Sequence, residues 1–97
     1  MFVRLTHFSL PPERTAEIKK VYHEEIAPVI HEQPGIMDVM LLEPVQSEDE
    51  FISCTVWTSE SHVKAFESSK IYQEVFGKIK AATTKSPYQK YYHFEKN

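Results

Sequence analysis

The sequence predicts an α+β domain built from strands and helices in the order strand, helix, strand, strand, helix, strand. Three observations support this order. The 97 residues suit a single domain spanning residues 1–97, since one core organises roughly 100 residues. Four short runs rich in β-branched and aromatic residues end at prolines or polar turns, as strands do. Two longer segments repeat apolar residues every three or four positions, which is the helical period.

The first strand and the first helix come from the N-terminal third of the chain. Residues 2–10 are strand-like and stop at Pro11-Pro12, where a central strand cannot continue. Apolar side chains then form one helical stripe over residues 18–30, with charged residues opposite. Pro28 lies inside this stripe without a backbone N–H, so we expect a kink or an early end to regular helix. The turn Gln33-Pro34-Gly35 closes the segment.

The middle of the chain predicts a β-hairpin. Residues 36–43 and 51–57 are two apolar, strand-like runs. The polar stretch 44–50 between them is typical of an exposed connection. We therefore expect the two strands to pair antiparallel.

The remaining residues predict the second helix and the last strand. Ser59 is placed to cap the helix, with Glu60 favoured in its first turn by the helix dipole. The apolar stripe that follows is broken, and Ser68-Ser69 mark an expected bend. Residues 88–94 are aromatic enough for a final strand.

This order of elements predicts the ferredoxin-like βαββαβ plan, a four-stranded antiparallel sheet with both helices on one face. The other face would still carry apolar side chains from the strands. A large exposed patch of that kind normally meets a partner or a ligand. We therefore expect a homodimer that forms through this sheet face.

Composition excludes several classes of protein. Lys and Arg number 11 against 14 Asp and Glu, and a formal net charge of -3 gives no electrostatic reason to bind nucleic acid or an anionic membrane. No apolar stretch approaches the roughly 20 residues that span a bilayer. The single Cys54 allows neither an internal disulfide nor paired metal thiolates. With no recognisable signal segment at its start, we expect a cytoplasmic protein.

Two segments carry a resemblance to a known family. They are the turn Gln33-Pro34-Gly35-Ile36 after the first helix and the run 56–62, in which Trp57 ends a strand and His62 opens the second helix. With the chain length, they resemble the antibiotic biosynthesis monooxygenase family. The resemblance implies a dimeric α+β barrel. That family includes cofactor-free oxygenases of quinols and polycyclic aromatics, haem-degrading enzymes, and members with no demonstrated activity.

The catalytic patterns of two family branches are altered in this chain. The resemblance places His7, Phe66 and Phe76 where the haem-degrading branch has an Asn, a Trp and the iron-binding His. Phenylalanine offers iron no lone pair, so that axial ligand is missing. Phe66 also stands where quinol-oxidising members often carry a His nine residues after the strand-three Trp. We therefore expect no metal and no cofactor, and rank haem binding third among the functions.

His7 is the candidate catalytic base. Cofactor-free oxygenation requires a base that converts the substrate into an electron-rich anion and a dry cavity that holds this anion beside oxygen. An imidazole on a strand can take a proton near neutral pH without strong tuning. His7 shares one side of the first strand with Val3 and Leu5. The alternative is that His7 is a structural strand histidine.

Four aromatic residues are candidates for binding a planar substrate. Phe66, Tyr72 and Phe76 lie on the second helix, and Trp57 stands at the corner that leads into it. Stacked rings suit a flat aromatic ligand. The alternative is that they fill the core, as aromatic stripes on helices commonly do.

The leading functional prediction is a cofactor-independent monooxygenase that acts on a small planar aromatic substrate, such as a quinol or an anthrone. The alternative is a non-catalytic ligand-binding or stress-related dimeric α/β barrel. The missing helix-two histidines favour this alternative, whereas an open pocket containing His7 would favour the enzyme.

Overall fold

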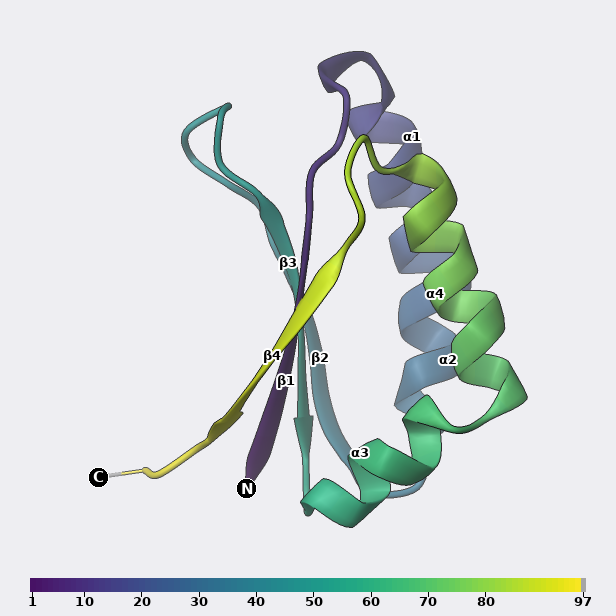
Figure 1. The fold of residues 1–97 in the computed structure, drawn as a ribbon, viewed down its shortest axis with the longest axis vertical. Helices are drawn as coiled ribbons and strands as arrows, with labels where there is room; N and C mark the ends of the chain where they lie inside the picture. The colour runs from purple at the N-terminus through teal and green to yellow at the C-terminus, as the bar shows by residue number, and fades with distance from the viewer. Residues whose placement is uncertain (97) are drawn as a thin grey trace.

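The computed structural model describes residues 1–96 and has the predicted α+β architecture, a single sheet with its helices on one face (Figure 1). The sheet is antiparallel throughout, with strand order β2-β3-β1-β4, as the ferredoxin-like plan requires. The elements are β1 Phe2–Phe8, η1 Pro12–Arg14, α1 Thr15–Val21, η2 Tyr22–Ile26, α2 Ala27–His31, β2 Ile36–Leu42, β3 Phe51–Trp57, α3 Glu60–Glu67, α4 Lys70–Ala82 and β4 Tyr88–His93.

The first helical segment is irregular where Pro28 predicts it. The turn η2 is π-helical, and the N–H of Ala27 bonds to the carbonyl of Tyr22, five residues back. Because Pro28 cannot donate to the carbonyl four residues earlier, the chain widens by one residue before the proline. Tyr22, at the start of η2, donates or accepts a 2.8 Å hydrogen bond with Ser53 of β3. The wide turn thus stays fixed to the sheet.

The second helical segment bends at the predicted serines. It divides into α3 and α4 at Ser68-Ser69. Ser69 caps α4, because its Oγ accepts a 3.1 Å hydrogen bond from the Tyr72 N–H. Ser59 stands at the N-terminus of α3 without capping a backbone N–H. Its hydroxyl is instead 2.7 Å from Nδ1 of His62.

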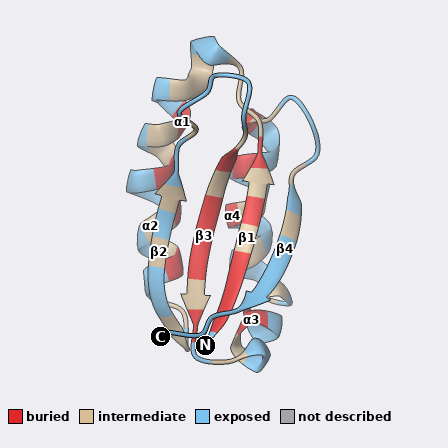
Figure 2. Cartoon of the chain, turned by 90° about the vertical axis from the view of Figure 1, so that its left-hand side faces the viewer, coloured by how far each residue is buried: buried red, intermediate tan, exposed pale blue. Residues whose placement is uncertain are grey.

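The two sheet faces differ in what covers them. Phe2, Arg4, Thr6 and Phe8 of β1 point toward the helices, and Val3, Leu5 and His7 point to the open face. The central strands β1 and β3 are mostly buried, whereas the edge strands β2 and β4 are mostly exposed (Figure 2). Across residues 1–96, no helix combines the length and apolar character needed to cross a bilayer.

Gly35 closes the turn before β2 in a conformation that other residues rarely adopt. Its φ is +83°, and a Cβ built there would lie 2.3 Å from Cγ of His62. We expect Gly35→Ala to lower the free energy of unfolding by about 1–3 kcal/mol. The matched control is Gly77→Ala in α4, where a Cβ meets nothing within 4 Å. That substitution should stabilise the protein by about 0.5–1 kcal/mol. Urea unfolding of both variants checks the difference, and equal midpoints would contradict it.

Candidate functional site

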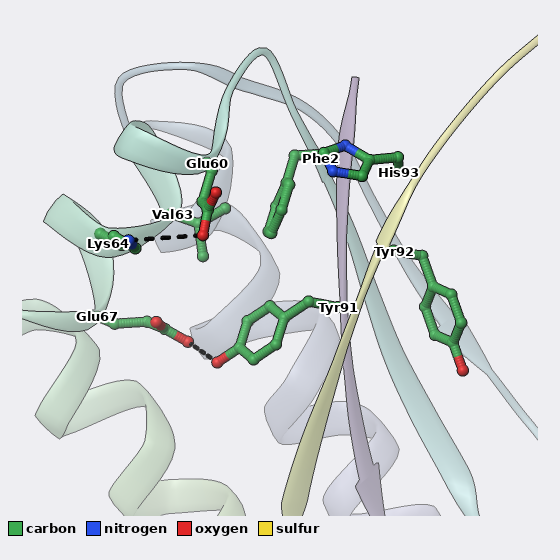
Figure 3. A pocket seen from close by; sticks show the side chains of 8 residues that line it. All are labelled: Phe2, Glu60, Val63, Lys64, Glu67, Tyr91, Tyr92 and His93. Carbon is green, nitrogen blue, oxygen red and sulfur yellow. Dashed lines mark hydrogen bonds and ion pairs between the residues drawn. The ribbon is translucent and has the colours of Figure 1, made fainter.

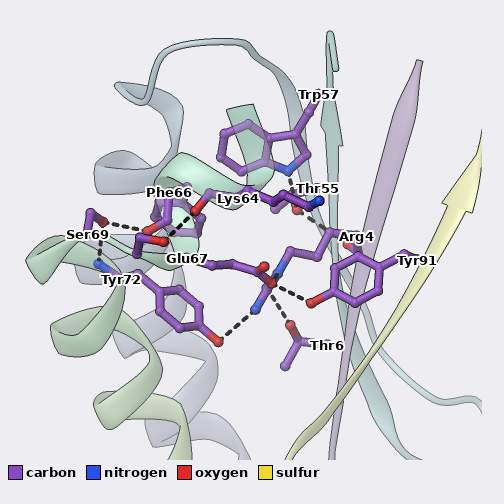
Figure 4. Close-up of polar contacts among 11 residues, drawn as sticks. Arg4, Thr6, Thr55, Trp57, Lys64, Phe66, Glu67, Ser69, Tyr72 and Tyr91 are labelled. Atoms are coloured by element: carbon purple, nitrogen blue, oxygen red, sulfur yellow. Dashed lines mark hydrogen bonds and ion pairs between the residues drawn. The ribbon is translucent and has the colours of Figure 1, made fainter. Parts of the chain in front are cut away.

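A buried arginine organises the polar groups between the sheet and the second helical segment. Arg4, in the middle of β1, is only 5% exposed. Its Nε donates to Oε2 of Glu67 at 2.7 Å. Its two terminal nitrogens donate to Thr6 Oγ1 and to the Tyr72 hydroxyl, each at 2.8 Å (Figure 4). All three nitrogens therefore have acceptors, as a buried guanidinium requires.

Glu67 joins this network to the edge strand β4. The Tyr91 hydroxyl donates to the same Oε2 atom at 2.5 Å. Burial, and then the hydrogen bond to Glu67, raise the pKa of the Tyr91 phenol. Burial also raises the pKa of the Tyr72 phenol, although the neighbouring Arg4 acts in the opposite direction. Both phenols therefore stay protonated at neutral pH, and Tyr91 serves as a donor that fixes one oxygen of the carboxylate.

A cavity of about 400 Å³ opens beside this network, between α3 and β4. Figure 3 shows the Glu67–Tyr91 hydrogen bond at its wall, with the Glu60–Lys64 ion pair on the same helix as Glu67. Phe2, Tyr91 and His93 place three aromatic rings on the helix-facing side of the sheet. The lining residues are Phe2, Glu60, Val63, Lys64, Glu67, Tyr91, Tyr92 and His93. A hollow that combines aromatic rings with a fixed carboxylate suits a planar ligand that carries a hydrogen-bond donor.

The four aromatic residues singled out by the sequence lie together. The Trp57 ring centroid is 5.2 Å from that of Phe66, Phe66 is 5.3 Å from Tyr72, and Tyr72 is 5.5 Å from Phe76. The Trp57 indole is 0% exposed and its N–H donates to Thr55 Oγ1 at 2.8 Å. None of the four lines the α3–β4 cavity. They stand behind it, with Tyr72 linked to the cavity wall through Arg4.

The structure places His7 on the opposite face of the sheet. It lies near the far end of β1 from the cavity, since His7 pairs with Tyr88 and Phe2 pairs with His93. Its ring stacks on Tyr88 with centroids 4.7 Å apart, and its Nδ1 is 3.7 Å from Oε1 of Glu50. Its buried Nε2 has no partner among the described residues.

A second, shallower hollow of about 390 Å³ adjoins His7 and includes Glu50. A carboxylate beside Nδ1 and a free Nε2 is an arrangement that suits a base. Within the chain, however, His7 does not meet the four aromatic residues. The fold therefore separates the predicted base from the predicted substrate-binding rings.

Sequence reasoning missed Glu67 and Tyr91, which line the cavity, and Arg4, which holds the Glu67 carboxylate in place. One signal was present. Arg4 occupies the same side of β1 as Phe2 and Phe8, and an arginine on that side needs a buried acceptor if the side faces the core. Nothing local in the sequence identified Glu67 as that acceptor, because the two residues are 63 positions apart.

The positions that resemble the haem-degrading pattern hold no iron ligand in the fold. Phe66 is buried between Trp57 and Tyr72, and the Phe76 ring packs on Tyr72. A hydrocarbon ring at Phe76 cannot bind iron. The residues present therefore do not fit that mode of haem ligation.

Comparisons with known proteins agree with this architecture. A variant of SnoaB, a cofactor-independent oxygenase from Streptomyces nogalater, superposes with a TM-score of 0.82 at 16% identity, over 99% of this chain and 94% of that one. A variant of MhuD with two manganese protoporphyrin IX molecules per active site gives 0.81 at 18%, over 100% and 97%. A conserved protein from Methanosarcina mazei gives 0.81 at 14%, over 98% and 94%.

At these identities the structural matches establish the fold. No curated protein sequence matches the chain. The family model described as antibiotic biosynthesis monooxygenase matches residues 1–78, which is most of the chain. The alternation of strands and helices, the Pro-Gly turn and the corner tryptophan thus have one common explanation: this chain belongs to the antibiotic biosynthesis monooxygenase family.

Proposed function

We propose that the protein is a cofactor-independent monooxygenase that acts on a small planar aromatic substrate, a quinol or an anthrone, bound in the cavity between α3 and β4. One observation carries the proposal. The Glu67 carboxylate stands at the wall of an aromatic cavity and is held there by the buried Arg4. A similar fold in SnoaB, a cofactor-independent oxygenase, supports the reaction class.

The chemistry requires an anion. A quinol or anthrone that loses a proton becomes electron-rich enough to pass an electron to oxygen without metal or flavin. For an anthrone, the methylene carbon takes one oxygen atom from O₂ to become a carbonyl, and the other oxygen leaves as water with the two hydrogens. The protein must therefore accept a proton and exclude bulk water from the anion.

Two groups are candidates for the base, and they belong to different hollows. Glu67 lies at the α3–β4 cavity, and His7 lies beside the hollow on the open face. His7 remains a proposed base because its Nε2 has no partner among the described residues and the Glu50 carboxylate lies 3.7 Å from its Nδ1. The two assignments predict different outcomes for two substitutions.

Oxygen uptake tests the function and the location of the site together. A panel of quinols and anthrones is supplied without added metal or flavin, to the parent and to Glu67→Gln and His7→Ala. We expect the parent to consume oxygen above the uncatalysed rate. Loss of the base should lower turnover by about 10²–10⁴-fold. The matched control is Glu74→Gln, an exposed carboxylate of α4 outside both hollows.

The outcomes distinguish the two possible positions of the site and the two candidate functions. Loss confined to Glu67→Gln locates the reaction in the α3–β4 cavity, and loss confined to His7→Ala locates it beside His7. No oxygen uptake with any compound, together with measurable binding of the same compounds, would favour the non-catalytic ligand-binding alternative. The aromatic residues at positions 66 and 76, where related enzymes carry histidine, are the feature that keeps this alternative open.

A further inference from the structure

Glu67 presents an unused hydrogen-bond acceptor at the cavity wall. Arg4 and Tyr91 both bond to Oε2 of Glu67, at 2.7 and 2.5 Å. No hydrogen bond from the described residues reaches the other oxygen, Oε1. The Glu67 side chain is 25% exposed, and the residue lines the cavity. The carboxylate is thus fixed through one oxygen and leaves the other for a ligand.

From this geometry we infer that Glu67 selects the substrate by its hydroxyl group: Oε1 accepts a hydrogen bond from an aromatic hydroxyl and rejects a carbonyl at the same position. The inference rests on the proposed function and specifies the ligand chemistry of the same cavity. An ionised carboxylate can only accept hydrogen bonds, so a ligand carbonyl facing it would put two acceptors together.

The fixed position makes this selection effective. Arg4 is itself held by Thr6 and Tyr72, and its guanidinium lies 5.0 Å from the Tyr72 ring centroid. The raised pKa of Tyr91 keeps its hydroxyl a donor to Glu67 at neutral pH. Since both neighbours are donors, rotation of the carboxylate would only exchange which oxygen faces the cavity. An acceptor always remains on the ligand side.

The same selection favours turnover. A quinol, or an anthrone in its enol form, is the reduced substrate and carries the hydroxyl that Oε1 accepts. Oxidation to a quinone converts a hydroxyl into a carbonyl at that position, so the product loses a hydrogen bond and gains a repulsive contact. The cavity therefore holds the reduced compound more tightly than the oxidised one.

Three stable bicyclic probes test the inference without any turnover. They are 1-naphthol, which has a hydroxyl, 1-methoxynaphthalene, in which the oxygen cannot donate, and 1-tetralone, which has a carbonyl. Binding to the parent is measured by equilibrium dialysis. We expect 1-naphthol to bind at least about tenfold more tightly than either of the others, since a hydrogen bond to a charged group contributes that much.

Glu67→Gln is the decisive variant because it changes one acceptor into a donor. Arg4 and Tyr91 both donate to Oε2, so the glutamine carbonyl should take that place and turn its NH₂ toward the cavity. The preference should then reverse, with 1-tetralone binding more tightly than it does to the parent. Glu50→Gln makes the same change beside His7, where Glu50 accepts a 2.5 Å hydrogen bond from Tyr88. The matched control is Glu74→Gln on the exposed surface of α4. Both should leave the preference intact.

The results separate failure of this inference from failure of the proposed function. Equal binding of all three probes to the parent would overturn the selection by Glu67 and leave an aromatic-binding cavity in place. If Glu50→Gln removes the preference for 1-naphthol and Glu67→Gln keeps it, the selection is not made by Glu67. The probes then bind in the hollow beside His7. No binding of any probe would overturn both. The binding of the three probes to the parent protein tests the selection even if Glu67→Gln does not fold.

Discussion

Replacing Arg4 by methionine should lower the free energy of unfolding by about 3 kcal/mol, because it breaks a largely buried ion pair and removes its hydrogen bonds. Met fills much of the volume of the arginine stem, so a cavity is not the main effect. The Glu67 carboxylate would keep only the Tyr91 hydroxyl as a donor. Thr6 and Tyr72 would also lose the nitrogens that bond to them now. We take the lower end of the usual range because Glu67 retains 25% exposure to water.

Two further variants identify the cause of this loss. Lys19→Met removes an ion pair of similar length, 2.8 Å to Glu43, whose side chains are 37% and 50% exposed. It should cost less than about 1 kcal/mol. The double variant Arg4→Met/Glu67→Met leaves no unpaired charge and should recover much of the stability. Urea unfolding at one fixed protein concentration measures all three. A double variant no more stable than Arg4→Met would show that the unpaired carboxylate is not the cause.

The order of elements was predictable because each depends on local pattern. The apolar stripe over residues 18–30, the prolines and the serine pair are all short-range signals, and the structure confirms the predicted helical segments and the bend at Ser68-Ser69. The irregular turn before Pro28 was also predictable, since a missing N–H must disturb the helix somewhere nearby. The predicted helix cap at Ser59 was wrong, because its hydroxyl bonds to His62 rather than to the backbone.

The face of the sheet that the helices cover was not predictable. On β1 both sides carry apolar residues, Phe2 and Phe8 on one and Val3 and Leu5 on the other, so a period of two does not choose between them. The alternation did place His7 with Val3 and Leu5, as the structure confirms. Which side would face the cavity depends on contacts made by residues far along the chain, such as Glu67 with Arg4. The candidate site was therefore only partly accessible from the sequence.

The covered and open faces have an unusual distribution of polarity. On the helix-covered side, β1 and β3 carry Arg4, Thr6, Ser53 and Thr55, all buried, and each takes part in a hydrogen bond. On the open side, β3 presents Ile52, Cys54 and Val56. A surface that faced only water would show the opposite arrangement. The side of the central strands without helices is thus apolar as well, although no helix covers it.

The open face extends this apolar character to both edges of the sheet. Met40 and Leu42 of β2 are 39% and 46% exposed, and Tyr88 and Tyr92 of β4 are 42% and 51% exposed. Contiguous exposed apolar surface of this kind marks an interaction site. A second copy of the chain offers a matching sheet, and a two-fold arrangement would cover both at once. We therefore propose a homodimer through this face, with a total buried area above about 1,000 Å².

Placing a charge on this face should then convert the dimer into monomers. Tyr92→Glu and Met40→Glu act on opposite edges of the sheet, and an unpaired charge buried at an interface costs several kcal/mol, roughly a 10²–10³-fold weaker dissociation constant. Gln73→Glu adds the same charge on the exposed surface of α4 and should leave association unchanged. Sedimentation velocity over a range of micromolar concentrations should give twice 11.4 kDa for the parent and the control, and 11.4 kDa for the two variants. A parent that sediments as a monomer throughout would refute the dimer. Variants that stay dimeric would move the interface away from this face, because an unpaired charge buried at either edge of it would weaken the association.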